Sequence, residues 1–150
     1  MSDRSQVKRN LRYHRIIVIS IVITYIWVQY EFSSGKWSYS NGTPKIEGEH
    51  VNGQDEGTWT WYYENRKKQM QGTFHNGKRN GIWIIWDVNE NKVSESMYND
   101  DKLNGAFTHW YSNGRKESEG IYQDDKLIGS VIYYNEDGSI KETKYYSGNE

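Results

Sequence analysis

Glycine recurs at intervals of 24 residues through much of this chain, and this period limits the folds open to it. The series consists of Gly57, Gly81, Gly105 and Gly129. Each of these glycines opens the same phrase, in which two short aromatic-rich runs are separated by polar turns. A fixed period of roughly 20 to 50 residues is the signature of a repeat array. We therefore predict stacked copies of one small unit.

The period divides the chain into five units, and similar residues recur at the same place in each. The units are 35–56, 57–80, 81–104, 105–128 and 129–150. The first and last are shorter, as terminal caps of repeat arrays are. The position two residues after the opening glycine holds Trp37, Trp59, Trp83, Phe107 and Val131. Five residues after it, the later units hold Tyr62, Trp86, Trp110 and Tyr134.

Turn signals separate the aromatic runs. Clear Asn-Gly or Asp-Gly pairs are found at 41–42, 52–53, 76–77, 113–114 and 137–138. Such pairs adopt the positive φ that tight type I′ hairpin turns demand. The pairs at 65–66, 89–90, 100–101 and 124–125 are weaker versions, in which a residue other than glycine is strained. Two strands of about six residues and two turns fill a 24-residue unit. We expect each opening glycine at a turn exit or bend that leaves no room for a side chain.

These features predict an all-β fold: tandem β-hairpins that form an elongated, twisted, antiparallel single-layer sheet over residues 33–150. Alternation along a strand puts Trp59 and Trp61 on one face and Tyr62 on the other. We expect Trp59, Trp83 and Phe107 to be structural rungs between neighbouring hairpins. On the opposite face we predict an exposed stripe that binds a peptide, a glycan or a lipid headgroup. Its candidate residues are Tyr62, Trp86, Trp110, Tyr111 and Tyr134.

Composition narrows the classes of function. Hydrophobic residues are few, at 35%, but aromatic residues reach 15%, which suits a thin sheet whose Tyr and Trp rings are only partly buried. The chain has no cysteine, which excludes disulfides and thiolate metal sites. Residues 1–15 carry a net charge of +4, which leaves −5 for the rest of the chain. A mildly acidic domain does not suit a phosphate backbone, so we do not expect nucleic acid as a partner.

The amino-terminal segment predicts membrane targeting. A basic tail over 1–15 precedes an almost uninterrupted apolar run from Ile16 to Val28, and aromatic residues follow up to Phe32. We interpret 16–32 as a single transmembrane helix, a signal anchor whose basic end is cytoplasmic and whose repeat domain is extracytoplasmic. A cleaved signal peptide, which would give a secreted repeat domain, is the alternative. A buried soluble segment fits this uniform run less well.

The sequence contains no motif for catalysis. His14, His50, His75 and His109 lack the spacing of a metal site, and no nucleophile motif such as G-x-S-x-G occurs. The acidic pairs at 100–101 and 124–125 fall in phase with turns, so we interpret them as turn formers and not as calcium ligands. We predict no enzymatic activity, no metal and no cofactor.

The repeat phrase resembles a known family. Its pattern, Gly-x-Trp-x-x-Trp/Tyr-x-x-Asn-Gly-x-x-x-x-Glu-Gly-x-Tyr-x-Asn-Gly, is similar to the bacterial variant of the MORN (membrane occupation and recognition nexus) repeat, found in YwqK-family antitoxins. The pairs Glu47-Gly48 and Glu119-Gly120 fall in phase, whereas the third unit has Glu95-Ser96. The resemblance covers 35–150 and implies an elongated sheet of hairpins with roles in membrane association, scaffolding or protein contact.

Three functions follow as hypotheses. The leading one is a membrane-anchored, non-catalytic scaffold that contacts a protein or another component of the cell envelope. The second is a module that binds cell-wall carbohydrate through its aromatic residues. The third is an antitoxin-like component of a toxin–antitoxin system, which requires a cytosolic repeat domain. The sequence leaves the ligand and the oligomeric state open.

Overall fold

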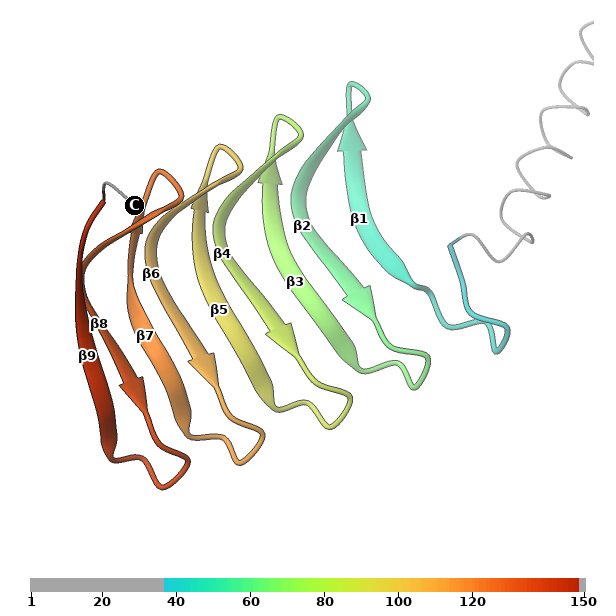
Figure 1. The fold of residues 1–150 in the computed structure, drawn as a ribbon. Helices are drawn as coiled ribbons and strands as arrows, with labels where there is room; N and C mark the ends of the chain where they lie inside the picture. Colours follow the sequence, from blue (N-terminus) through green and yellow to red (C-terminus); the bar gives the residue numbers. More distant parts are fainter. Residues whose placement is uncertain (1–36, 149–150) are drawn as a thin grey trace, which may run out of the picture. The chain divides into compact units, whose positions relative to one another are not determined.

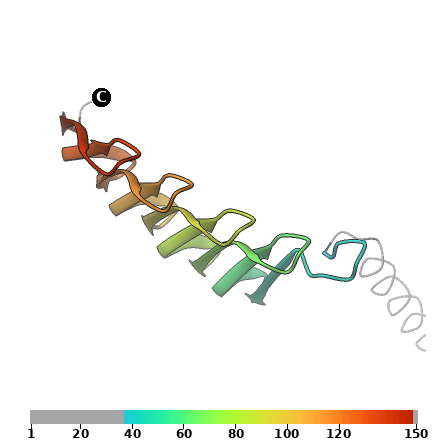
Figure 2. The same cartoon turned by 90° about the horizontal axis from the view of Figure 1, so that it is seen from below.

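Nine strands form one antiparallel sheet in a computed structural model that describes residues 37–148. The strands lie side by side in chain order, so the chain is an uninterrupted meander (Figure 1). They are β1 (Ile46–Val51), β2 (Gln54–Tyr62), β3 (Lys68–His75), β4 (Lys78–Trp86), β5 (Lys92–Asn99), β6 (Lys102–Trp110), β7 (Lys116–Gln123), β8 (Lys126–Tyr134) and β9 (Ile140–Ser147). Seen from below, the sheet is a single twisted layer (Figure 2). The prediction of tandem hairpins in one all-β sheet is confirmed.

The predicted basic tail and transmembrane helix, 1–15 and 16–32, lie outside the described residues. Between residues 37 and 148 the structure has no helix of the length and apolar character that a membrane span requires. The sheet belongs to one unit, Thr43–Glu150. In the other unit, the amide of Gly42 donates to the carbonyl oxygen of Tyr39 at 3.0 Å, which closes the turn predicted at Asn41-Gly42.

The turns that follow the odd-numbered strands β1, β3, β5 and β7 contain two residues, both with positive φ. Asn76 and Gly77 have φ of 52° and 76°, and Asp124 and Asp125 have 49° and 66°. This is the type I′ conformation that the sequence predicts here. The turn amides also bond to the preceding repeat: the amide of Asp125 donates to the carbonyl of Leu103 at 2.9 Å.

The turns that follow the even-numbered strands β2, β4, β6 and β8 are longer than predicted. Each spans five residues, and only the fourth has positive φ, as Arg66 (69°) and Gly114 (80°) do. The amide of Arg66 donates to the carbonyl oxygen of Tyr63 at 3.0 Å. A single left-handed residue closes such a loop, so the preceding asparagine does not need a positive φ. The expectation of tight type I′ turns at these sites is wrong.

The four period glycines lie inside strands, which corrects the expectation of a turn exit. The strands have eight or nine residues instead of about six, except β1, and each period glycine is the fourth residue of an even-numbered strand. Gly57, Gly81 and Gly129 have φ of 69–75°, and a methyl group added to any of them would meet nothing within 4 Å. At these three positions glycine is therefore required by backbone conformation and not by lack of room. At Gly105 the expectation of too little room is correct, because a methyl group there would be 2.6 Å from the sulfur of Met97. Opposite Gly81 the register with β3 shifts, so the glycine forms part of a β-bulge.

A second set of glycines makes room for the aromatic ladder. Gly72 lies beneath the Trp83 indole, and a methyl group there would be 2.1 Å from a ring carbon. Gly48 has the same relation to Trp59. In the third unit the equivalent residue is Ser96, and the residue that pairs with it from β6 is the smaller Phe107. Gly120 lies beneath the still smaller Val131, where a methyl group would be 2.8 Å from a side-chain carbon, so Ser96 is the one exception to glycine among these four positions.

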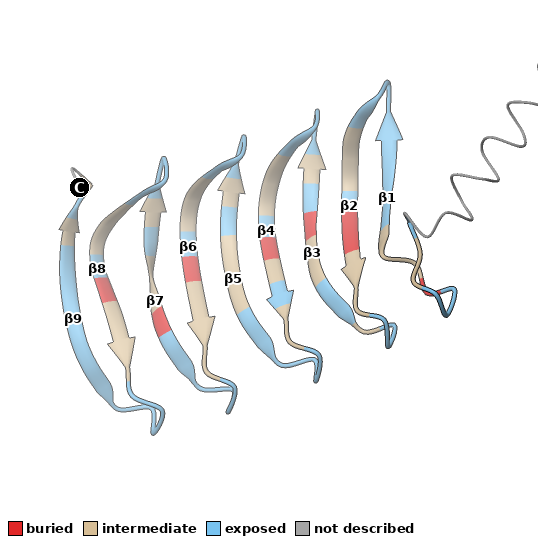
Figure 3. Ribbon diagram, turned by 45° about the vertical axis from the view of Figure 1, so that its right-hand side comes forward, coloured by how far each residue is buried: buried red, intermediate tan, exposed pale blue. Residues whose placement is uncertain are grey.

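The apolar core is a line of one buried residue from each even-numbered strand, and the buried segments of β2, β4, β6 and β8 lie in a row across the sheet (Figure 3). Trp59, Trp83 and Phe107 are 5–7% exposed, and Val131 continues the line fully buried. Rings on the odd-numbered strands fill the spaces between them. The Phe74 centroid lies 5.8 Å from that of Trp59 and 5.0 Å from that of Trp83. The predicted structural rungs are confirmed, and contacts between consecutive repeats run through them.

Candidate functional site

Four of the five predicted surface residues form a row on the face opposite the ladder. Tyr62, Trp86, Trp110 and Tyr134 are the last residues of β2, β4, β6 and β8. Trp59 and Trp61 share the ladder face, where their ring centroids are 6.1 Å apart. The Tyr62 hydroxyl instead donates to Glu47, which pairs with Thr60. The predicted division of the aromatic residues between two faces is confirmed.

Lysine and acidic or amide side chains from the odd-numbered strands complete this row. We call the whole set the charged aromatic row: Tyr62, Trp86, Trp110 and Tyr134, with Lys68, Lys92 and Lys116 and with Glu47, Gln71, Glu95 and Glu119. Successive aromatic members are two strands apart, which corresponds to about 10 Å. The row therefore offers the same chemical group repeatedly at a fixed distance.

Where the row has a tyrosine, the hydroxyl is bonded to a glutamate. Tyr62 donates to Glu47 at 2.7 Å, and Tyr134 donates to Glu119 at 2.5 Å. Because each bond needs the protonated phenol, the bonded carboxylate raises the pKa of Tyr62 and the pKa of Tyr134. These hydroxyls are fixed in one orientation and leave part of each carboxylate facing solvent.

Where the row has a tryptophan, a lysine lies over the ring. The Nζ atom of Lys68 is 5.9 Å from the Trp86 centroid, and that of Lys92 is 5.4 Å from the Trp110 centroid. These are cation–π distances. One face of each indole is therefore covered by an ammonium group of the same chain.

The ammonium group of each lysine also bonds to the side chain three residues later in its own strand. Lys92 reaches Glu95 at 2.7 Å, and Lys116 reaches Glu119 at 2.6 Å. The Lys116 ammonium, followed by the Tyr134 hydroxyl, lowers the pKa of Glu119, and the Glu119 carboxylate raises the pKa of Lys116. Both groups are charged near neutral pH, so β5 and β7 each add one positive and one negative charge to the row, whereas on β3 Lys68 bonds to the neutral Gln71.

Tyr111, the fifth predicted residue, has a different place. It is the first residue of the loop after β6, and its hydroxyl donates to the carbonyl of Tyr134 at 2.7 Å. Tyr63 makes the equivalent bond to the carbonyl of Trp86 at 2.9 Å. The hydroxyl of Tyr111 thus holds neighbouring repeats together and does not belong to the row.

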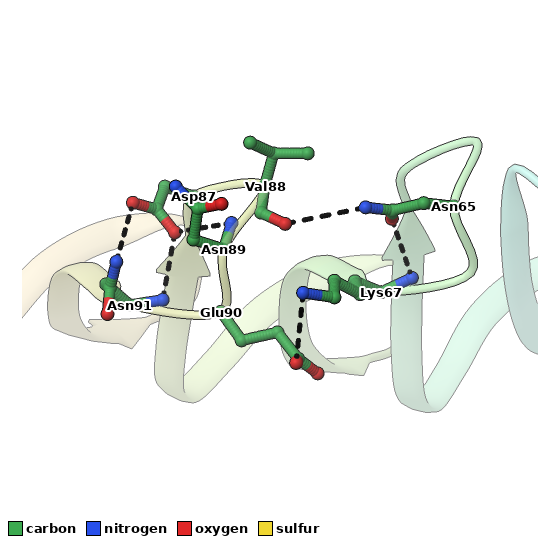
Figure 4. A network of polar contacts seen from close by, with 7 residues as sticks. All are labelled: Asn65, Lys67, Asp87, Val88, Asn89, Glu90 and Asn91. Carbon is green, nitrogen blue, oxygen red and sulfur yellow. Dashed lines mark hydrogen bonds and ion pairs between the residues drawn. The ribbon is translucent and has the colours of Figure 1, made fainter.

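The loops after the even-numbered strands are joined by a second kind of bond. The Asn65 amide donates to the carbonyl of Val88 at 3.4 Å (Figure 4). Asp87 stands where other units have Tyr63 and Tyr111, and it caps its own loop by accepting from Asn89 and Asn91. Within residues 37–148, no side-chain hydrogen bond joins this loop to that of Tyr111.

The other residues considered for chemistry have structural partners. His50 and His75 each lie 2.9 Å from a carboxylate, those of Asp55 and Glu56, while His109 lies 3.4 Å from the Ser118 hydroxyl. His14 lies outside the described residues. No group of three or more His, Asp or Glu side chains in the described part of the chain is arranged to hold a metal ion.

The acidic turn pairs after β5 and β7 bond to the even-numbered strand of the preceding repeat, β4 and β6 respectively. Asp101 accepts from the amide of Arg79 at 2.9 Å and from its guanidinium at 3.1 Å, while Asp100 lies 3.5 Å from Lys78. The Arg79 amide, followed by its side chain, lowers the pKa of Asp101. Aspartate is strained at φ 72°, but its carboxylate accepts a hydrogen bond from a strand amide, which glycine has no side chain to do.

The sequence indicates that lysine and glutamate flank the aromatic residues, but the individual lysines and glutamates of the row were not among the predicted site residues, and neither was a depression on the ladder face. The lysines recur at 68, 92 and 116, with the same 24-residue period as the glycines, so this signal was present. The depression has a volume of about 380 Å³. Its lining residues are Trp61, Met70, Phe74, Arg79, Trp83, Ile85, Ser94, Ser96 and Tyr98.

Comparison with protein families gives one match, to the MORN repeat variant, over residues 55–76. This stretch runs from β2 to the turn after β3 and covers most of one 24-residue period. The matched family is a structural repeat, not a catalytic domain. No curated protein matches the chain.

Proposed function

We propose that this protein is a non-catalytic scaffold whose charged aromatic row binds an extended segment of a protein partner. The proposal rests on one recurring group along β2 to β8 on a single face: an aromatic residue, a lysine, and a glutamine on β3 or a glutamate on β5 and β7. Such a row matches a chain that presents side chains of both charges at regular intervals. Tyrosine and tryptophan are enriched at protein interfaces and among the residues that contribute most to binding there.

The lysine ammonium groups that lie over the tryptophan rings favour a protein ligand over a glycan. A sugar ring stacks on an open aromatic face, whereas Lys68 and Lys92 lie over the Trp86 and Trp110 indoles. The Glu–Lys pairs can instead exchange partners with charges on a bound peptide. Carbohydrate binding by the same row is the second candidate, supported by the regular spacing of its aromatic rings.

Photocrosslinking in cells tests the proposal. A photoreactive residue is placed at Lys92 in the full chain, and a matched one at Lys102, an exposed lysine at the start of β6. We expect a discrete protein adduct from position 92 only, and its loss when Trp86→Ala and Trp110→Ala are added. Equal adducts from both positions would contradict the proposal. Retention on cell-wall glycans, lost in the same double variant, would favour the carbohydrate alternative.

We also propose that residues 16–32 anchor the chain in a membrane and that the repeat domain is extracytoplasmic. The support is the apolar run, its basic amino-terminal flank and its aromatic carboxyl end. Alkaline phosphatase fused to the carboxyl terminus should be active. A fusion to green fluorescent protein that fluoresces, together with inactive phosphatase, would place the repeats in the cytosol, where the antitoxin-like role would apply.

A further inference from the structure

The last strand of the sheet, β9, has an open side. It is hydrogen-bonded to β8, and no other strand among residues 37–148 lies beyond it. Seven of its eight residues are exposed, including Ile140 at 63% and Tyr145 at 80%. An edge strand with unpaired amides and carbonyls is a template for another strand unless its side chains prevent pairing.

The sequence of β9 prevents extension of the sheet by another repeat strand. At the place of Lys144, the earlier odd-numbered strands have Gly48, Gly72, Ser96 and Gly120. Gly48 and Gly72 are needed because the ring of the next strand lies directly on them. A lysine side chain at this position occupies the space that such a ring would need. The occupant of the edge must therefore be a strand of another type.

We propose that β9 pairs with β9 of a second copy of this chain, antiparallel and centred on Thr143. In this register Thr143 faces its own twin, and Glu142 faces Lys144 of the second copy. Lys141 then faces Tyr145, and Ile140 faces Tyr146. Opposite charges, Thr–Thr, and aromatic with aliphatic or cationic side chains are all favourable cross-strand pairs. β9 is thus complementary to itself at each of these positions.

Charged residues on an edge strand often serve to keep other strands from pairing with it, but the order of the charges on β9 favours pairing with a second β9. Charges of one sign along β9 would repel a twin strand, but the signs alternate about Thr143. Within one chain, Lys144 and Glu142 already lie 3.2 Å apart on the same face. Two copies would bring two such pairs together as four charges of alternating sign.

The symmetry of this contact makes it self-limiting. A twofold contact uses the same strand on both copies, so it closes at two chains and does not propagate into a fibre. Two sheets of nine strands would join into one of eighteen. The two charged aromatic rows would then lie on the same face of a continuous surface.

Cysteine cross-linking of the full chain in detergent micelles tests the register, because the native chain has no cysteine. Residues directly opposite in an antiparallel pair have Cα atoms about 4.5–5.5 Å apart, within disulfide range. Thr143→Cys should therefore form a disulfide-linked dimer under mild oxidation. In Lys141→Cys, the control, the two Cα atoms would be about 14 Å apart and should not be linked. Equal linkage of both variants, or of neither, would overturn the proposal.

Charge-reversal variants of β9 provide a second test of the proposed dimer. Glu142→Lys and Lys144→Glu each place like charges opposite one another, and each should weaken dimerisation roughly ten-fold or more. Mixing the two variants should restore dimers, since every contact then joins Lys to Glu. Both residues are exposed, so the fold should be unchanged, which circular dichroism checks. If the mixture dimerises no better than either variant alone, β9 does not pair in this way.

Discussion

At the scale of single residues, two sets of glycines have different physical roles although they recur with the same period. Gly81 has empty space around a hypothetical Cβ but a φ of 75°, whereas a Cβ on Gly72 would overlap the Trp83 indole. The first glycine is required by its backbone conformation and the second by packing. Substitution separates the two causes.

Gly72→Ala should destabilise the sheet more than Gly81→Ala. Left-handed strain at Gly81→Ala costs about 1–2 kcal/mol. At Gly72→Ala the methyl group displaces a buried ring in the core ladder, and overpacking of this kind costs about 1–3 kcal/mol or more. Urea unfolding followed by circular dichroism measures both costs.

A double substitution supplies the control for packing. Gly72→Ser with Trp83→Phe reproduces the pair that the third unit has in Ser96 and Phe107. The two changes should cost less together than the sum of their separate costs. Strict additivity would show that Trp83 does not determine the need for glycine at 72.

Asp101 should make stability depend on pH in the acid range. Its pKa lies below the ordinary value of 3.8 because its carboxylate accepts from the Arg79 amide and guanidinium. A depressed pKa in the folded state gives a stabilisation that is complete above the unfolded pKa and is lost as pH falls through the folded one.

The urea midpoint should therefore fall more steeply below about pH 4 in the native chain than in Asp101→Asn. Subtracting one profile from the other removes the shared contribution of other carboxylates. Parallel profiles would mean that the bond to Arg79 does not stabilise the fold. An NMR titration of the carboxyl group checks its pKa directly.

At the scale of strands and loops, neighbouring repeats are held by hydrogen bonds at both ends of the hairpins and by rings between them. The loops after the even-numbered strands depend on a tyrosine hydroxyl, as in Tyr63 and Tyr111. The loop that begins at Asp87 instead bonds to itself. The loop edge therefore has a weaker junction between the third and fourth units.

Tyr111→Phe should cost about 1 kcal/mol, because it removes one hydrogen bond and keeps the ring. Amides of the loop after β8 should then exchange hydrogen faster. Tyr98→Phe is the matched control, since Tyr98 contributes a ring 4.2 Å from the Arg79 guanidinium carbon. Equal effects of the two changes would show that the Tyr111 hydroxyl has no special role.

The order of elements could be predicted from the sequence, but their internal details could not. The pairs Asn52-Gly53 and Asn76-Gly77 locate two-residue turns, since their φ preferences are local. Alternation likewise separates Trp61 from Tyr62. The bulge at Gly81 depends on the partner strand β3, and the lysine over Trp86 depends on side chains brought from two strands. Neither is determined by local sequence.

At the scale of the whole molecule, the sheet is a linear array in which each unit contacts its neighbours. In such an array each unit contacts only the units next to it. Whole 24-residue units should therefore be removable or replaceable without disrupting the rest of the sheet. The charged aromatic row and the buried ladder are two consequences of the same period, one on each face. The central claim is that 24 residues form one structural unit.

Deletion of whole and half periods tests this claim most directly. Removal of 81–104 joins Asn80 to Gly105 in phase and leaves a sheet of seven strands. It should retain the circular dichroism spectrum and cooperative urea unfolding, at reduced stability. Removal of 81–92 takes out half a period, places ladder residues out of register and should abolish cooperative folding. If both deletions unfold the chain, or if both leave it equally stable, the repeat is not the unit of this structure.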